Sequence, residues 1–254
     1  LVKNYPTIPE MNKYLVVLPL LFTLAVCQHL HANEVHKPLR VEPLTDGVYV
    51  HTSYKHFERS GWIDSNGLVV VHQDQAFIVD TPWSETDTEL LLKWIAGQGW
   101  QLQGSISTHF HDDRTAGIAL LNSKSIPTYT SKMTDEILLE KGKTRALNSF
   151  SGESFEMLGG RVQAFYPGEG HAKDNLVIWL PEQQVLFGGC LIRSFEWGSL
   201  GFTGDASIGR WASSVQKVKD KFNPITLVVP GHGKPGDATM LDHTMGVVEQ
   251  NTNK

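Results

Sequence analysis

The stretch Ser107-Thr108-His109-Phe110-His111-Asp112-Asp113-Arg114 determines how the rest of the chain is interpreted. It follows a short run of β-forming residues at 104–106 and precedes an apolar segment, 115–121, that predicts a helix. We therefore expect a strand-to-helix loop, in which side chains can converge on one point. The pattern His-X-His-X-Asp offers two imidazoles and one carboxylate, all donors suited to zinc. The alternative is a polar surface turn.

Three further candidate donors each follow an apolar, strand-like run through a glycine-containing turn: His171, Cys190 and His232. Glycine lets the backbone turn sharply beside the donor. Taken singly, such a histidine is more often a surface residue, and such a cysteine is more often a small buried residue. With His109, His111 and Asp113 the set reaches six donors, which suits two zinc ions that each keep an open position.

Composition restricts the class of protein. With 254 residues, 41% of them hydrophobic, the chain can bury a large core. The formal net charge of -5 and the lack of a basic stripe argue against nucleic acid as a partner. Nothing in the sequence requires an oligomer, so we expect a monomer.

The segment 11–32 predicts a secretory signal peptide. It has a basic start at Lys13, then an apolar run that is too short for a comfortable membrane span. We expect cleavage after Ala32 and export to the periplasm. The alternative is lipid attachment at Cys27, which would bring the protein to a membrane. Residues 1–10 precede the expected start and are interpreted as extra upstream sequence.

The rest of the chain, 33–254, is expected to form one domain, because no Pro-, Gly- or Ser-rich linker divides it. It keeps Cys190 as its one cysteine, so no internal disulfide is expected. Strands and helices alternate in both halves, which predicts an α/β fold of two sheets packed face to face under outer helices. Expected strands are 47–51, 68–71, 76–79, 104–106, 126–130, 161–166, 176–180, 185–187 and 227–229. Expected helices are 84–96, 115–121, 134–141, 211–222 and 238–250, with a loop at 142–152.

The donor set resembles that of the metallo-β-lactamases, and more narrowly their di-zinc, cysteine-containing first subclass (class B, subclass 1). The resemblance covers nearly the whole mature chain and includes the motifs Asp80-Thr81-Pro82-Trp83, Gly204-Asp205-Ala206 and Gly231-His232-Gly233. It implies a four-layer αβ/βα sandwich of two mixed sheets, with the metals at one edge. It also implies one zinc held by His109, His111 and His171, and a second held by Asp113, Cys190 and His232.

The function implied by the resemblance is hydrolysis of the β-lactam amide of penicillins, cephalosporins and carbapenems, which confers antibiotic resistance. Zinc lowers the pKa of bound water from about 16 to near 7. We therefore hypothesise that a zinc-bound hydroxide, oriented by Asp113, is the nucleophile. One alternative is a hydrolase of the same fold that acts on thioesters, lactones or phosphodiesters; such relatives usually have a histidine where this chain has Arg114. Another is a non-catalytic exported zinc-binding protein, which would favour closed coordination.

Two residues are expected to define the substrate side of the site. Arg193 follows Cys190 by three positions, and its guanidinium could bind the carboxylate of a β-lactam in a bidentate manner. A solvated surface arginine is the alternative. Phe202 occupies the place of an asparagine that relatives usually carry, so a hydrogen bond to the lactam oxygen would be missing.

Other residues are expected to enclose or support the site. Phe57 and Trp62 lie in a polar hairpin connection and predict a mobile flap over the substrate. Trp83 is expected either in the pocket wall or in the core. Arg114 and Asp112 are expected to orient the ligands.

Overall fold

A computed structural model describes residues 1–3 and 37–252 of the chain. The expected signal segment, cleavage after Ala32, lipid attachment at Cys27 and most of the upstream residues 1–10 lie outside these described residues. All helices and strands that are described belong to the unit that begins at Lys37. None of these helices has both the length and the apolar character needed to cross a membrane.

The first sheet has seven strands in the order β1-β2-β3-β4-β5-β6-β7. Pairing is antiparallel from β1 to β4 and parallel from β4 to β7, so the sheet is mixed. Its strands are β1 (Arg40–Thr45), β2 (Val48–Phe57), β3 (Gly61–His72), β4 (Gln75–Val79), β5 (Gln101–Ile106), β6 (Thr128–Ser131) and β7 (Asn148–Phe150). Four helices follow these strands: α1 (Glu85–Gly97), α2 (Asp112–Thr115), α3 (Ile118–Ser123) and α4 (Lys132–Glu140).

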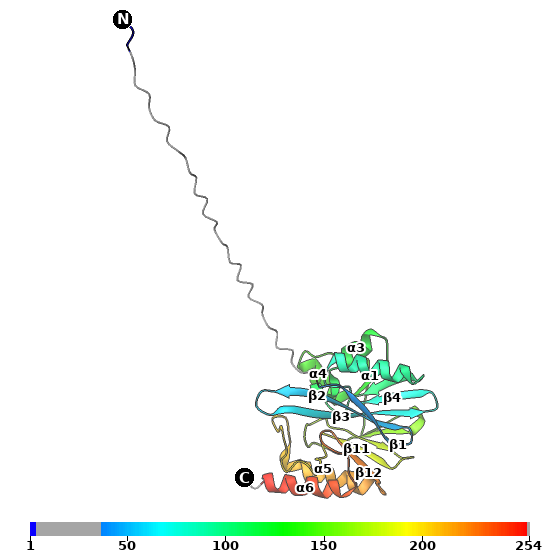
Figure 1. Cartoon of the computed structure of the whole chain (residues 1–254). Coiled ribbons are helices and arrows are strands. Elements are labelled where there is room, and N and C mark those ends of the chain that lie inside the picture. Colours follow the sequence, from blue (N-terminus) through cyan, green and yellow to red (C-terminus); the bar gives the residue numbers. More distant parts are fainter. Residues whose placement is uncertain (4–36, 253–254) are drawn as a thin grey trace. The chain divides into compact units, whose positions relative to one another are not determined.

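The second sheet has five strands in the order β12-β11-β10-β9-β8, and only β11 and β12 pair in parallel. Its strands are β8 (Ser154–Met157), β9 (Val162–Phe165), β10 (Val177–Leu180), β11 (Val185–Gly189) and β12 (Leu227–Pro230). A 3-10 turn, η1 (Leu158–Gly160), joins β8 to β9, and the outer helices are α5 (Ile208–Lys221) and α6 (Thr239–Thr252). Figure 1 shows α1, α3 and α4 beyond the first sheet and α5 and α6 beyond the second.

The alternation of side chains along β3 explains why both faces of the first sheet are covered. Leu68 and Val70 join the cluster between the two sheets, while Val69 joins the cluster under α1. Successive side chains of a strand point to opposite faces, so an unbroken apolar run requires a layer on each side. A third cluster, which includes the fully buried Trp211 of α5, fills the space between the second sheet and its helices. The predicted four-layer αβ/βα sandwich is confirmed.

The start of α1 follows its sequence signal. Ser84 caps the helix: its Oγ accepts a hydrogen bond from the backbone N–H of Asp87 at 3.0 Å. The same hydroxyl donates to the carboxylate of Asp87 at 3.0 Å. Because a cap of this kind satisfies backbone donors that have no partner inside the helix, it sets the first residue of the helix.

Some of the expected helices and strands differ from the observed ones in where they begin and end, and some observed strands were not expected. The segment 115–121 is not one helix; α2 and α3 are separated at Gly117, where an added Cβ would lie 2.4 Å from Oγ1 of Thr88. The loop expected at 142–152 contains β7, which is anchored by the buried Phe150. Strands β1 and β8 were not expected, since β1 contains Pro43 and β8 has only four residues. The strand expected at 47–51 continues to Phe57.

Candidate metal centre

All six predicted donors lie just beyond the ends of central strands. They occupy the loop after β5 and the short α2 (His109, His111 and Asp113), the loop after β9 (His171), the residue after β11 (Cys190) and the turn after β12 (His232). The two sheets pack face to face, so these ends meet at one edge. The structure therefore brings together donors that are up to 123 positions apart (232 − 109).

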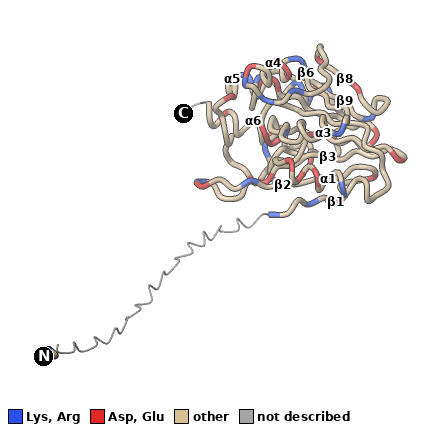
Figure 2. The backbone as a smooth tube through the Cα atoms, turned by 90° about the horizontal axis from the view of Figure 1, so that it is seen from above, with Lys and Arg blue, Asp and Glu red and all other residues tan. Residues whose placement is uncertain are grey.

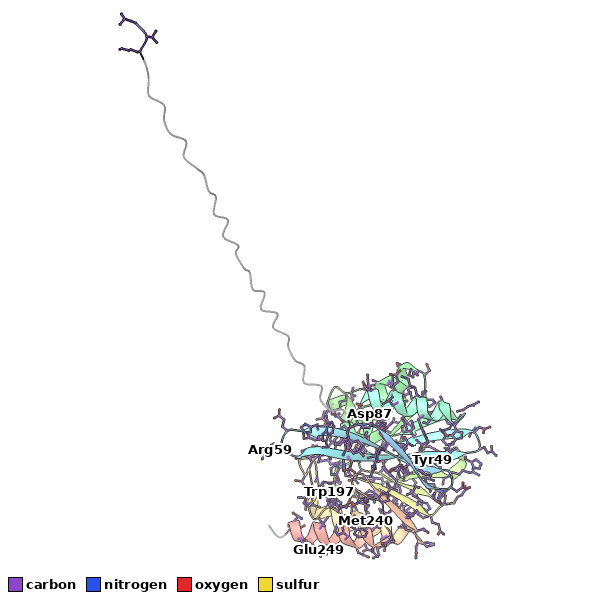
Figure 3. The ribbon with its side chains drawn as sticks, viewed as in Figure 1. Tyr49, Arg59, Asp87, Trp197, Met240 and Glu249 are labelled. Carbon is purple, nitrogen blue, oxygen red and sulfur yellow. The ribbon has the colours of Figure 1, made fainter. Side chains whose placement is uncertain are left out.

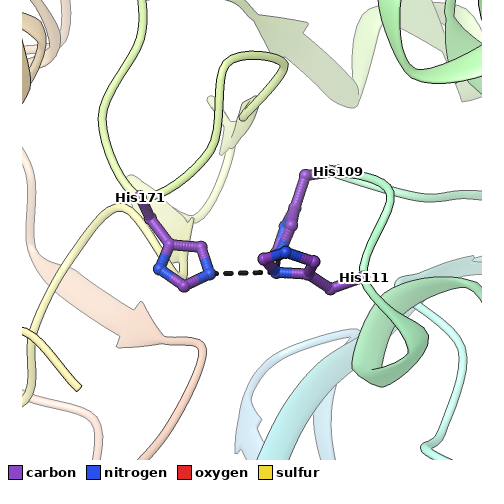
Figure 4. Close-up of side chains that lie close together, drawn as sticks. All are labelled: His109, His111 and His171. Atoms are coloured by element: carbon purple, nitrogen blue, oxygen red, sulfur yellow. Dashed lines mark hydrogen bonds between the residues drawn. The ribbon is translucent and has the colours of Figure 1, made fainter. Parts of the chain in front are cut away.

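Three imidazoles form the first donor group (Figure 4). His111 Nδ1 lies 3.0 Å from His109 Nε2 and 3.2 Å from His171 Nε2. Nitrogens bound to one tetrahedral zinc at about 2.0–2.1 Å would be about 3.3–3.4 Å apart. The observed spacing is close to that value, so the arrangement fits a metal ion at the centre of the three nitrogens.

Burial keeps two of these imidazoles in the neutral form that binds metal. His109 and His171 are both buried. Burial, followed by the neighbouring His111, lowers the pKa of His171 to about 3. Burial also lowers the pKa of His109 well below its usual value. A neutral imidazole presents a lone pair, and three lone pairs at one point favour a cation there.

The second donor group combines a carboxylate, a thiol and an imidazole. Asp113 Oδ2 lies 3.5 Å from Cys190 Sγ and 3.4 Å from His232 Nε2. Cys190 Sγ lies 3.3 Å from His232 Nε2. Donor atoms of His109, Asp113 and Cys190 also lie within 4.8 Å of one another, so the two groups adjoin.

Electrostatics at the second group also favour a cation. Burial opposes ionisation of Asp113, but Arg114 and His232 outweigh it and hold the pKa of the carboxyl well below its usual value. Burial likewise opposes protonation of His232, yet Cys190 and Asp113 raise its pKa to about 10. The ionised carboxylate of Asp113 is therefore balanced by Arg114 and by a proton on His232, and a zinc ion could take the place of that proton. The donor set fits zinc.

Hydrogen bonds fix the orientation of two of the ligand rings. His111 Nε2 donates to Asp205 Oδ2 at 2.9 Å, and this leaves Nδ1 to face the first donor group. His232 Nδ1 donates to the backbone carbonyl of Asp64, and this leaves Nε2 to face the second. Such partners set the tautomer and the basicity of a ligand histidine. In the sequence, Asp205 stands out only as part of the motif Gly204-Asp205-Ala206, and no local pattern marks Asp64.

Arg114 contacts the second donor group from the protein interior and is fully buried. One terminal nitrogen, Nη2, lies 2.8 Å from Asp113 Oδ2 and donates to Cys190 Sγ at 3.1 Å. The other, Nη1, donates to Asp80 Oδ2 at 3.2 Å. Three acidic partners keep the guanidinium charged although burial opposes it, and the pKa of Arg114 is raised. Arg114 thus contacts two donors directly, which is the placement expected of a ligand-orienting residue.

Asp80 completes this buried network. Its carboxylate accepts hydrogen bonds from the backbone N–H and the hydroxyl of Thr108, at 2.6 and 2.8 Å. Burial raises the pKa of Asp80 to about 7 although Arg114 and Thr108 oppose the shift. Because Thr108 immediately precedes His109, this contact anchors the loop that carries the first ligand.

Asp112 does not contact the donors, in contrast to the expectation that it orients them. Its side chain is 55% exposed, and its Oδ1 accepts from Lys143 Nζ at 2.7 Å. Lys143 also donates to the backbone carbonyl of Phe110, so Asp112 takes part in a surface contact of the loop. Asp113, the next residue of α2, points inward instead.

Aromatic side chains border the two donor groups. The ring of Trp83 lies 5.8 Å from that of His232, and Phe57 packs against Trp83 at 5.6 Å. On the other side, Phe202 lies 5.7 Å from the His111 ring and is 63% exposed. Trp83 is half-buried beside a donor and is not part of the core clusters.

Phe57 ends β2 and Trp62 lies at the start of β3, so the two residues flank the hairpin turn and are not part of the connection itself; the mobile flap stays a prediction. They are 39% and 37% exposed, and Trp62 packs against His56 at 5.2 Å. Figure 3 labels Arg59, which lies at the free end of this hairpin. The hairpin therefore presents apolar surface close to the metal-binding edge, where a bound molecule could cover it.

Arg193 is only 6% exposed, so the alternative of a solvated surface arginine is wrong. Its Nε donates to the backbone carbonyl of Ser199 at 3.0 Å, and its guanidinium lies 6.0 Å from the ring of Trp197. Within residues 37–252, neither Nη1 nor Nη2 of Arg193 has a hydrogen-bond partner. Burial lowers the pKa of Arg193, which indicates a charge that would gain from an anionic ligand.

The surface charges of the described residues are mixed in sign. Figure 2 shows Lys and Arg interspersed with Asp and Glu along the backbone, without a continuous basic stripe.

Comparison with known proteins gives consistent matches. Residues 60–232 match the family model described as "Metallo-beta-lactamase superfamily". A "Metallo-beta-lactamase type 2" from Pseudomonas aeruginosa is 42% identical over 227 residues, 88% of this chain and 91% of that protein. One of the same name from Bacteroides fragilis is 33% identical and covers 94% of this chain and 97% of that protein. The solved structure of TMB-1 has a TM-score of 0.84 and 49% identity, over 85% of this chain and 100% of that chain. The solved structure of DIM-1 metallo-beta-lactamase has a TM-score of 0.84 and 44% identity, over 85% of this chain and 99% of that chain.

Proposed function

Because this chain belongs to the metallo-β-lactamase superfamily, we propose that it hydrolyses the amide bond of β-lactam antibiotics with zinc as its cofactor. The two adjoining donor groups are the observation that carries this proposal. Each group offers three protein ligands and leaves a position open, as catalytic zinc sites do. We assign one zinc to His109, His111 and His171, and a second to Asp113, Cys190 and His232. Penicillins, cephalosporins and carbapenems are the proposed substrates.

Zinc held by these residues would act as a Lewis acid and would lower the pKa of a bound water to near 7. The chain itself supplies the positioning. Asp113 is ionised, so its carboxylate can accept a hydrogen bond from the attacking water and orient it. Arg114 keeps that carboxylate in place at 2.8 Å. Phe57, Trp83 and Phe202 border the site with apolar surface, which excludes bulk water once a substrate is bound.

The other hydrolases of this fold are a weaker match to this site. Their thioester, lactone or phosphodiester chemistry is expected with a histidine after Asp113, and the guanidinium of Arg114 occupies that place here. A non-catalytic zinc-binding protein would favour closed coordination, whereas each donor group here has three ligands. Export to the periplasm is proposed from the apolar segment 11–32 alone.

Purified protein should hydrolyse a carbapenem, and a chelator should abolish the reaction. The expected result is loss of the carbapenem absorbance with zinc present, no loss after chelation, and recovery when zinc is added back. Titrating zinc against activity would give the number of ions that turnover requires. A zinc-loaded protein that leaves penicillin, cephalosporin and carbapenem intact, yet cleaves a thioester or lactone, would reject the proposed substrate class.

Arg193→Ala should raise the Michaelis constant for β-lactams more than it lowers turnover. The guanidinium is fixed at Nε by Ser199, and we propose that its terminal nitrogens bind the substrate carboxylate. A charge-assisted hydrogen bond contributes about 1.5–3 kcal/mol, which corresponds to roughly a 10- to 100-fold rise. Steady-state kinetics would test this, with Arg193→Lys as the variant that keeps the charge. An unchanged Michaelis constant in Arg193→Ala would remove Arg193 from substrate binding.

A further inference from the structure

Strand β3 passes beside the turn Gly231-His232-Gly233 and contacts it through Asp64. The backbone carbonyl of Asp64 accepts from His232 Nδ1. The carboxylate of the same residue accepts from the backbone N–H of Gly233, with Oδ2 at 2.6 Å. One residue therefore holds the ligand ring and the peptide that follows it, although 168 positions separate it from His232.

The turn needs such an anchor because glycine flanks His232 on both sides. Gly233 has φ +82°, and a Cβ there would lie 2.7 Å from Cβ of Ser194. At Gly231 an added Cβ would lie 2.7 Å from Nη2 of Arg114. Glycine is thus required for the close packing, but it leaves the backbone freer than any other residue would. The orientation of His232 must come from contacts outside the turn.

Asn66, two residues further along β3, supplies contacts of the same kind. Its Nδ2 donates to the carbonyl of Gly233 at 2.7 Å and to that of Pro230 at 3.1 Å. These are bonds between neutral groups. The bond from Gly233 to Asp64 ends on a carboxylate, and charge-assisted bonds are roughly twice as strong as neutral ones.

We propose that Asp64 is a positioning residue, whose carboxylate fixes the Gly231-His232-Gly233 turn so that His232 Nε2 faces the Asp113–Cys190 pair. The inference rests on the proposed function in one respect, namely that Asp113, Cys190 and His232 bind a metal ion. Loss of a group that orients a ligand typically lowers metal affinity about 10- to 100-fold. The loss should be confined to this metal, because the contacts of Asp64 are to its ligand and not to His109, His111 or His171.

Truncation of Asp64 should leave the fold intact. The side chain is half-buried and lines a surface cavity of about 520 Å³, together with Glu42, Trp62 and Lys234. Removing its carboxylate widens a space that is already open, so no closed void forms in the core. The matched control is Glu42→Ala, which removes another acid from the same cavity. Glu42 forms an exposed pair with Arg40 at 3.4 Å.

The test compares metal binding by full-length Asp64→Ala, Asp64→Asn, Glu42→Ala and wild-type protein. Cobalt(II) replaces zinc, because a cobalt–thiolate absorption band reports the ion bound to Cys190 separately from the ion at the three histidines. We expect Asp64→Ala to bind the thiolate-linked cobalt about 10- to 100-fold more weakly, with the other ion unaffected. Asp64→Asn, whose neutral amide oxygen can still accept from Gly233, should recover part of the affinity and bind the ion more tightly than Asp64→Ala does. Glu42→Ala should match the wild type.

Wild-type affinity in Asp64→Ala would overturn the proposal, as would equal weakening at both ions or an Asp64→Asn variant as weak as Asp64→Ala. A wild-type protein that shows no cobalt–thiolate band at all would overturn the two-metal assignment along with it. A protein that shows the expected bands but cleaves no β-lactam would contradict the proposed substrate and leave the role of Asp64 supported.

Discussion

Replacing Asp113 with alanine is expected to lower turnover about 10²- to 10⁴-fold, the range usual for loss of a positioned acid–base group. The carboxylate lies 3.4 Å from His232 and 2.8 Å from Arg114, so its removal affects both the metal site and the orientation of the attacking water. Initial rates with a penicillin and a carbapenem at saturating zinc would measure the effect. Metal content must be determined for the same sample, so that a lost ion is distinguished from a lost orienting group.

Asp112→Ala is the matched control, because it removes the same side chain one residue earlier. The Asp112 carboxylate pairs with Lys143 at the surface, so turnover should stay within about twofold of wild type, as for surface substitutions away from special features. Near-normal turnover of Asp113→Ala with a full complement of zinc would contradict the role given to Asp113. A large loss in Asp112→Ala would instead restore the ligand-orienting role that the sequence pattern indicated.

These two aspartates show which features of the site were predictable from sequence. The six donors could be predicted, because each follows a strand-like run, three of them through a glycine turn, and the ends of the strands meet at one edge. The role of Asp112 could not be predicted. The His-X-His-X-Asp spacing marks Asp113 as a donor but does not show where its neighbour points, and α2 buries Asp113 while Asp112 lies at the surface.

Contacts between distant segments were the other feature that sequence did not predict. The bonds from Asp64 and Asn66 to the turn around His232 join residues more than 160 positions apart, and no local pattern marks them. The same reasoning applies to Arg193, whose burial depends on the loop that contains Ser199. Strands β1 and β8 were missed for a local reason, since β1 contains a proline and β8 is only four residues long, and burial against the sandwich stabilises them.

Arg114→Ala is expected to lower the free energy of unfolding by about 3–5 kcal/mol, because removing one partner of a buried ionic group leaves uncompensated charge. Asp80, Asp113 and Cys190 would remain close together without the guanidinium that contacts all three. Urea unfolding of zinc-free wild-type and variant proteins would measure the difference. The matched control is Arg210→Ala, since Arg210 forms an exposed pair with Glu169 at 3.9 Å and should contribute little.

The loss of unfolding free energy in Arg114→Ala should grow as pH rises, because of the ionisation of Asp80. Burial raises the pKa of this carboxyl from 3.8 to about 7 in the folded protein, so folding favours its protonated form. In the wild type, the destabilisation of the folded protein by Asp80 is therefore absent below pH 4, increases between pH 4 and 7, and levels off above pH 7. Without Arg114 the folded pKa rises further, and the unfavourable contribution continues to increase beyond pH 7. Equal stability of variant and wild type at pH 8 would contradict the assignment of Arg114 as the residue that balances these buried acids.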